Sequence, residues 1–248
     1  MRTRIALLLT LAALTAAAQT AKPTARQAAA SPSDLSGVWS PFRPRGPEAP
    51  PPPTALALKP GYKERYDARR ALEREANARG EQLAAKGLCE PYGMPNMMQV
   101  AVYPMEVIQT AKQVTIVGEA FSEVRRIYMG KTQADLDDVD PGYYGHSVGR
   151  WEGGTLVVDT VGVKESVRGY QDMPHSAKMR ITERIRRTGM DGLQDQITIE
   201  DPVTLEKPLT YTLTYKLAPN YEMVEFVCEN NREYVDEKGV VRMKLHDK

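Results

Sequence analysis

Residues 145–161 read GHSVGRWEGGTLVVDTV, and this stretch decides the prediction of the fold. Its side chains follow the period of two that is typical of a strand with one buried face. The adjacent glycines Gly153 and Gly154 suit a primed two-residue hairpin turn. The stretch therefore predicts two antiparallel strands, 145–152 and 155–161, joined by a tight turn.

The turn also predicts how the two strands pair, because a two-residue loop places Glu152 opposite Thr155 and His146 opposite Val161. One face of the hairpin then carries Ser147, Gly149, Trp151, Leu156, Val158 and Thr160. The other face carries His146, Val148, Arg150, Val157, Asp159 and Val161.

His146 and Asp159 become diagonal neighbours on that second face, within reach of a hydrogen bond. An aspartate beside a histidine can fix its tautomer and raise its basicity, as a general base requires. The alternative is a solvated face, on which Arg150 pairs with Asp159 and His146 is an ordinary surface residue.

Outward from the hairpin, the period of two extends over most of the chain after residue 104. Further strands are expected at 104–110, 113–119, 122–129, 178–187, 193–200, 208–217 and 221–228. No helix alternates with them, so a mainly β, mainly antiparallel fold is predicted. Closure into an up-and-down, lipocalin-like barrel would remove the exposed edges, and a two-sheet sandwich is the alternative. Gly37-x-Trp39 is similar to the first strand of lipocalin-like barrels.

Ahead of these strands, residues 41–60 are rich in proline and predict an extended surface strap. Residues 62–86 form the strongest helical pattern of the chain, with charges spaced for i,i+4 pairs. The apolar stripe of this helix is thin, so we expect it to lie on the surface, and Gly87 is its expected end.

The first 18 residues have the charged start, short apolar core and small residues Ala16 and Ala18 of a secretory signal peptide. A membrane anchor is the alternative. Cleavage near Ala18 leaves a disordered lead at 19–33, one β domain at 34–236 and a tail at 237–248. We expect a periplasmic or secreted protein without stable membrane insertion. Its oligomeric state is open.

The charge of the chain and its cysteine content limit which partners and which cysteine chemistry we expect. Removing Arg2 and Arg4 leaves 31 basic residues against 32 acidic ones, and no basic block stands out, so nucleic acid is not an expected partner. Cys89 and Cys228 are an even pair in an exported chain, which favours a disulfide over a catalytic thiol or a zinc site.

Glu183 lies on the apolar face of strand 178–187, between Ile181 and Ile185. A carboxylate there either points into a ligand cavity, with a raised pKa as one result, or forms a buried salt bridge to Arg126 or Arg150. The loop 162–177, which carries Asp172 and His175, joins the Asp159 strand to the Glu183 strand. The candidate catalytic residues are therefore His146, Asp159, His175 and Glu183, gathered near one rim. Their spacing is poor for a metal, and no cofactor is expected.

Aromatic side chains suggest a ligand. Tyr211 and Tyr215 share a strand face, and with Tyr128 they can line a pocket for an apolar or aromatic molecule. Met98, from the methionine-rich stretch YGMPNMMQV at 92–100, and Arg150 complete the candidate ligand-binding set. Aromatic stripes of this kind also occur in ordinary cores.

Several of these segments resemble a large family of exported bacterial proteins, mostly uncharacterised. The resemblance covers about residues 34–232 and rests on CEPYGMP (89–95), PMEVIQT (104–110), GHSVGRWEGGTLVVDT (145–160), MPHSAKMRITER (173–184), ITIEDP (197–202) and VCEN (227–230). The family usually has Asp after WEG, where this chain has Gly154. The resemblance implies a shared polar site that includes His146, Asp159, His175 and Glu183, and it names no reaction.

Two functions fit these observations. The first is an enzyme that uses acid/base chemistry of the lyase, isomerase or cyclase type on a small apolar or aromatic molecule. The second is a non-catalytic periplasmic ligand-binding or envelope protein. A concave site shared by His146 and His175 would favour the enzyme.

Overall fold

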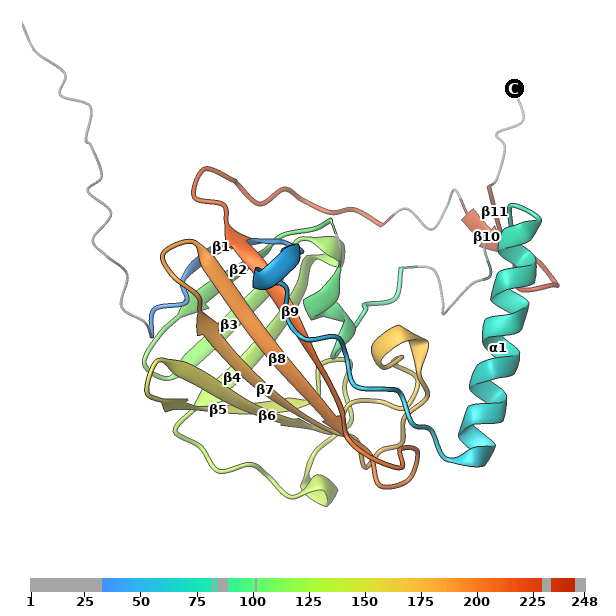
Figure 1. Cartoon of the computed structure of the whole chain (residues 1–248), viewed down its shortest axis with the longest axis horizontal. Coiled ribbons are helices and arrows are strands. Elements are labelled where there is room, and N and C mark those ends of the chain that lie inside the picture. Colours follow the sequence, from blue (N-terminus) through green and yellow to red (C-terminus); the bar gives the residue numbers. More distant parts are fainter. Residues whose placement is uncertain (1–32, 82, 84–88, 101, 229–232, 244–248) are drawn as a thin grey trace, which may run out of the picture.

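The computed structural model describes residues 33–81, 83, 89–100, 102–228 and 233–243. Within them, nine strands close into one barrel in chain order, and the helix α1 (Pro60–Ala78) lies beside it (Figure 1). The strands are β1 (Gly37–Pro41), β2 (Met105–Gln109), β3 (Gln113–Gly118), β4 (Glu123–Met129), β5 (His146–Glu152), β6 (Thr155–Val161), β7 (Arg180–Arg187), β8 (Gly192–Glu200) and β9 (Leu209–Leu217). The predicted barrel is confirmed, and the sandwich is not formed. The expected signal peptide, nearly all of the lead and the residue Gly87 lie outside the described residues.

One neighbouring pair, β4 with β5, is parallel, whereas the other eight pairs are antiparallel. This departs from a pure up-and-down barrel, and ring closure explains it. Strand direction reverses at every antiparallel pair, so a closed ring needs an even number of them, and nine strands leave one pair parallel. The connection 130–145 carries the chain back so that β5 can start beside β4.

The predicted hairpin is confirmed residue by residue. β5 and β6 pair from His146 with Val161 to Glu152 with Thr155. Gly153 has a φ of 59°, which a glycine adopts without steric cost and which the tight turn requires. Ser147, Leu156, Val158 and Thr160 face the barrel interior and are buried, as the alternation predicted.

The expected last strand at 221–228 is wrong, because that segment has no strand structure. β9 already pairs with β8 and β1, so the closed ring leaves no edge for a tenth strand. The segment is instead held by Glu119, whose carboxylate accepts hydrogen bonds from the Tyr221 hydroxyl at 2.8 Å and the Val224 amide at 3.0 Å. The expected tail contains structure as well, since β10 (Glu233–Val235) pairs with β11 (Val241–Met243).

Helix α1 begins at Pro60 and ends at Ala78, eight residues before the predicted end at 86. Proline is tolerated at the first helical position, because the amide hydrogen that it lacks would have no partner within the helix. Gly80, with a φ of 71°, ends the helix, and the Glu81 amide bonds back to the Ala76 carbonyl. Tyr62 and Tyr66 pack against the core while Leu72 is exposed, so the apolar stripe is thin, as expected.

Trp39 is fully buried in the barrel core. Its indole nitrogen donates to the Leu35 carbonyl at 2.9 Å, and the Arg187 guanidinium lies 4.9 Å from its ring centre. The cation over the ring and the satisfied indole explain why a tryptophan is stable at this position. The Gly-x-Trp motif thus occupies the first barrel strand.

The predicted Cys89–Cys228 disulfide is present, with the two Cα atoms 5.5 Å apart. It ties the segment before β2 to the segment after β9, across 139 residues. In the chain-entropy model, closing so long a loop stabilises the fold by about 5 kcal/mol. A disulfide favours an oxidising compartment. None of the described helices is both long enough and apolar enough to cross a membrane.

Candidate functional site

A cluster of charged side chains lies inside the barrel, where the alternation of four strands places it. Arg125 (β4) and Glu183 (β7) are both fully buried and form an ion pair with two parallel hydrogen bonds, one of them 2.8 Å long. Arg125 also donates to the hydroxyls of Ser147 (β5) and Thr160 (β6), at 3.2 and 3.0 Å. Glu183 therefore forms a buried salt bridge, but with Arg125 and not with the expected Arg126 or Arg150.

Asp195 on β8 adds a second carboxyl group to this cluster and is also fully buried. Neither of its oxygens accepts a hydrogen bond from a donor in the described part of the chain. Burial, and next repulsion by Glu183, raise the pKa of Asp195 well above its ordinary value of 3.8. The protonated carboxyl can donate to Glu183, and the cluster is then neutral: one guanidinium, one carboxylate and one acid.

Arg125 and Asp195 were not among the predicted site residues, although the sequence carries a signal for both. Leu193, Asp195 and Ile197 alternate onto one apolar face of β8, as Glu183 does on β7. On β4 the same alternation places Glu123, Arg125 and Ile127 inward. A charge that interrupts an apolar face predicts a buried partner, and three strands of the barrel, β4, β7 and β8, each carry such an interruption.

Beside this cluster, a cavity of about 610 Å³ lies where the proline-rich strap leaves β9. The Phe42 amide bonds to the Thr214 carbonyl and the Thr54 amide to the Thr210 carbonyl, both at 2.9 Å. Between these two contacts, residues 43–53 bulge away from the strand and roof the cavity. Aromatic and apolar residues form much of its wall: Phe42, Pro44, Pro50, Pro53, Tyr170, Tyr211, Leu213 and Tyr215. Polar residues line the rest: Arg43, Gln99, Gln171, Thr212 and Thr214.

Three tyrosines connect the cavity to the barrel interior. Tyr170, in the short helix η5 (Tyr170–Asp172), stacks on Tyr211 with ring centres 4.2 Å apart. The hydroxyl of Tyr211 is buried and has no hydrogen-bond partner among the described residues. Tyr215 donates to the Met98 carbonyl, and Met98 is itself buried in the core. Burial raises the pKa of Tyr211 and Tyr215 well above the ordinary value, so both remain neutral phenols.

His146 and Asp159 share the outer face of the hairpin, as predicted, but they do not bond to each other in this structure. The Arg180 guanidinium makes two hydrogen bonds to the Asp159 carboxylate. The Nδ1 atom of His146 lies 2.7 Å from the amide oxygen of Gln133. The same Gln133 side chain donates to the carbonyls of His146 and Asp159, so the connection 130–145 covers this face.

His175 is buried in the loop 162–177. Its Nε2 atom lies 2.6 Å from the Val167 carbonyl and its Nδ1 atom 3.0 Å from the Ser176 carbonyl. Both ring nitrogens are therefore engaged by the backbone. Asp201 holds the same loop, accepting bonds from the amide and hydroxyl of Ser176 at 2.6 and 2.9 Å. These contacts fit a structural role in shaping the loop.

The structure thus does not gather the four candidate catalytic residues near one rim. Glu183 points into the barrel, whereas His146 and Asp159 lie on the outer side of the sheet, because adjacent strand positions face opposite ways. Within the described residues, no group of three or more His, Cys, Asp or Glu side chains is arranged to hold a metal ion.

Of the candidate ligand-binding residues, Tyr211 and Tyr215 line the cavity and Met98 contacts Tyr215. Tyr128 and Arg150 lie on the outer face instead. Tyr128 stacks on His146 with ring centres 5.6 Å apart, and Arg150 pairs with Glu152 at 2.7 Å. Comparison of the chain with protein-family models, with curated proteins and with solved structures gives no match.

Proposed function

We propose that this protein is an exported small-molecule-binding barrel whose ligand is apolar or aromatic. The 610 Å³ cavity carries the proposal, because it combines three tyrosine rings and several prolines at the place where the strap leaves β9. Its volume lies within the range of about 300–1,000 Å³ that is typical of small-molecule sites. Arg43 is the one charged side chain of its lining, which favours a mainly uncharged body for the ligand.

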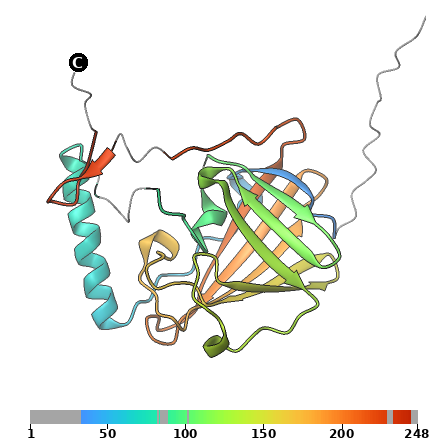
Figure 2. The same cartoon turned by 180° about the vertical axis from the view of Figure 1, so that it is seen from behind.

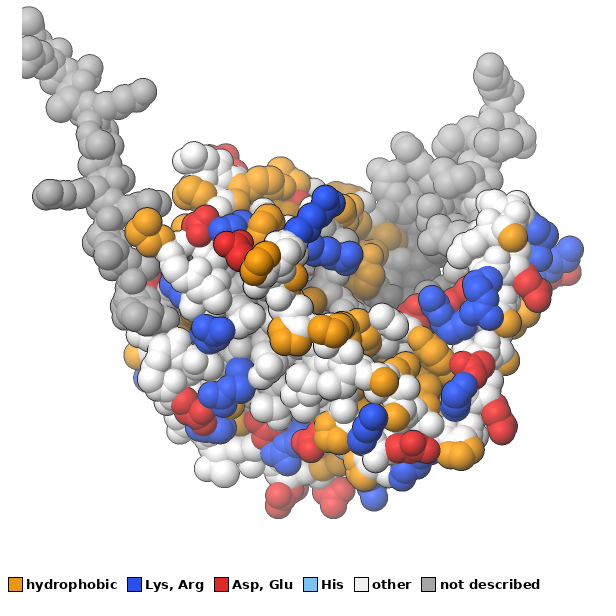
Figure 3. Space-filling view, in the orientation of Figure 1, with side chains coloured by type: hydrophobic (Ala, Val, Ile, Leu, Met, Phe, Trp, Pro, Cys, Tyr) orange, Lys and Arg blue, Asp and Glu red, His pale blue; other side chains and the backbone are white. Residues whose placement is uncertain are grey.

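The surface around the cavity agrees with this proposal. Apolar side chains gather between the strap and α1 on this face of the molecule (Figure 3). Rigid rings and prolines lose little conformational entropy when a ligand binds, so they provide contact area at low cost. The disulfide and the proposed signal peptide together support a periplasmic or secreted location, which also agrees with the resemblance to exported bacterial proteins.

Binding of a neutral aromatic probe tests the proposal. We expect phenylnaphthylamine, whose fluorescence rises in apolar surroundings, to bind the protein in a saturable way. Tyr170→Ala removes one ring from the cavity wall and should weaken the affinity about tenfold, since a stacked ring contributes about 1 kcal/mol beyond its buried area.

Tyr128→Ala is the matched control, because it removes the same ring from the outer face of the barrel, where it stacks on His146. The affinity of this variant should equal that of the wild type. Absence of saturable binding, or equal losses in the two variants, would contradict the cavity as the ligand site.

A second function, an acid/base enzyme, is favoured by one observation: a fully buried carboxyl group, Asp195, lies inside the barrel close to the cavity tyrosines, and burial raises its pKa. Asp195 pairs across the sheet with Leu213, between Tyr211 and Tyr215 on the same face. In this hypothesis Asp195 supplies the proton for the lyase or isomerase type of reaction, and His146 and His175 have no direct part.

Compounds carried by the protein distinguish enzyme from carrier. Wild type and Asp195→Asn are purified from the same cells, and the bound small molecules are extracted and compared by chromatography and mass spectrometry. An enzyme that needs Asp195 should retain a different compound, its unreacted substrate, in the variant. The same compound in both, and in the exposed control Asp191→Asn, would favour the carrier.

A further inference from the structure

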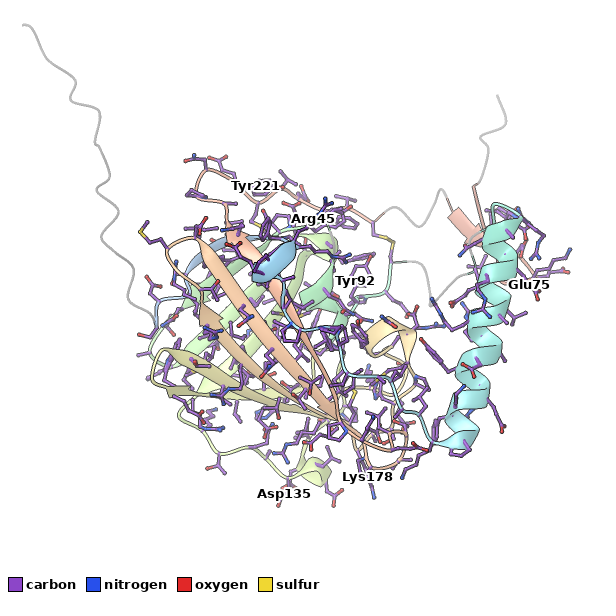
Figure 4. The ribbon with its side chains drawn as sticks, in the orientation of Figure 1. Arg45, Glu75, Tyr92, Asp135, Lys178 and Tyr221 are labelled. Atoms are coloured by element: carbon purple, nitrogen blue, oxygen red, sulfur yellow. A yellow bond between two sulfur atoms is a disulfide. The ribbon has the colours of Figure 1, made fainter. Side chains whose placement is uncertain are left out.

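Three cavities meet around the short helix η5. The 610 Å³ cavity shares Gln99 and Gln171 with a second cavity of about 290 Å³, and that one shares Asp172 with a third of about 440 Å³. In both ribbon views, η5 lies between the barrel and α1 (Figures 1 and 2). Tyr92, which lines the second cavity, lies on the side of the barrel that faces α1 (Figure 4).

We propose that these cavities form one elongated ligand groove whose far end, against α1, binds an anionic group. The ligand would then be an apolar or aromatic molecule that carries a carboxylate or a comparable anion. This inference rests on the proposed function and names the substrate class of the same site.

The charges of the third cavity support the anionic end. Its lining contains three arginines, Arg65, Arg69 and Arg168, against two acids, Glu165 and Asp172. The nearby Glu73 accepts hydrogen bonds from Arg69 and from Arg70, each at 2.8 Å.

Two of these arginines have N–H groups without a hydrogen-bond acceptor among the described residues. The Arg168 guanidinium approaches the carboxylates of Glu73 and Asp172 only to 3.8 Å, which is beyond hydrogen-bonding distance. Arg65 donates through Nε to the Gly61 carbonyl at 3.2 Å, and its guanidinium lies 4.6 Å from the Tyr62 ring centre. No carboxylate of the described chain lies within ion-pair distance of Arg65. A guanidinium with free N–H groups is suited to bidentate binding of a carboxylate.

Of the two acids of this cavity, Asp172 lies 3.8 Å from the Arg168 guanidinium and Glu165 has a backbone partner. Glu165 accepts the Ala177 amide at 2.8 Å. Asp172 lies in η5, where Gln171 and Asp172 have φ angles of 52° and 63°. Consecutive non-glycine residues with positive φ cost free energy, and such strain is found preferentially at ligand sites. Here it turns η5 so that Gln171 and Asp172 line the junctions between the three cavities.

A matched pair of probes tests the anionic end. Dansylaminoundecanoic acid and its methyl ester have the same apolar body and dansyl ring, and differ only in the charge. We expect the acid to bind about tenfold more tightly than the ester, and the preference to shrink at high salt. Arg168→Gln should remove most of this preference, because it weakens the binding of the acid and leaves the binding of the ester unchanged. Arg168→Lys should restore part of it.

Three further variants keep the test decisive. Arg65→Gln should lower the preference without the risk of disturbing the contact between Arg168 and helix α1. Arg186→Gln, which changes an exposed arginine of β7, should leave the preference unchanged.

Equal binding of acid and ester in the wild type would overturn the inference while the proposed function stands. A preference that is lost only in Arg43→Gln would place the anion at the strap instead. Failure of both probes to bind would contradict the proposed function itself.

Discussion

Replacing Arg125 by methionine is expected to lower the free energy of unfolding by about 3–5 kcal/mol, because it leaves a buried carboxylate without its partner. Arg125 is the cation that balances Glu183 in the barrel interior, and its other donors satisfy the hydroxyls of Ser147 and Thr160. Methionine has a similar length but cannot supply charge or donors. Urea unfolding followed by circular dichroism measures the loss.

The control for this prediction is Arg150→Met, since Arg150 has the same chemistry but pairs with Glu152 on the solvent-exposed face. Its unfolding midpoint should match the wild type within error. Glu183→Gln should lower the free energy of unfolding by less than Arg125→Met, because Asp195 can ionise and pair with Arg125 in its place. An Arg125→Met protein as stable as the wild type would contradict the buried cluster.

Asp195→Asn is expected to raise the stability at neutral pH and to flatten its dependence on pH. In the folded protein Asp195 keeps its proton well above pH 3.8, whereas in the unfolded chain it ionises near that value. Above pH 3.8 the folded state therefore binds more protons than the unfolded state, so stability falls as pH rises, by about 1.4 kcal/mol per pH unit. This loss continues up to the folded-state pKa of Asp195, and it is absent below pH 3.8.

The asparagine variant lacks the titration and can still donate to Glu183 through its amide. The stability difference between variant and wild type should therefore grow as the pH is raised above 4, up to the folded-state pKa of Asp195. Urea unfolding at intervals of about one pH unit measures it. Asp191→Asn, in the exposed turn before β8, should give a curve parallel to that of the wild type. A parallel curve for Asp195→Asn would show that Asp195 is already ionised in the folded state.

The strands and the hairpin could be predicted from the sequence because their signals are local. Gly153-Gly154 requires one turn type, and that turn determines the pairing of β5 with β6. The inward position of Glu183 follows from the period of two on its own strand. Two cysteines in a chain that is expected to be exported have few alternatives to pairing, so their bridge was predictable as well.

The errors arise where the deciding partner is remote in sequence. Strand 221–228 has a strand-like pattern, but β1 already occupies the edge that it would need. The alternation on β4 places Arg125 inward, but β4 and β7 are not neighbours in the sheet, and only the closed ring brings Arg125 to Glu183.

The class of fold, the hairpin, the disulfide and the inward position of Glu183 follow from the amino-acid sequence, because each depends on backbone preferences over a few residues or on residue type. The site depends on tertiary packing instead. Burial separates side chains on the two faces of one sheet, so His146 and Asp159 lie outside and Arg125, Glu183 and Asp195 inside. The cavity exists because a strap from the N-terminal part of the chain leaves the last barrel strand, a contact between segments about 160 residues apart that no local pattern specifies.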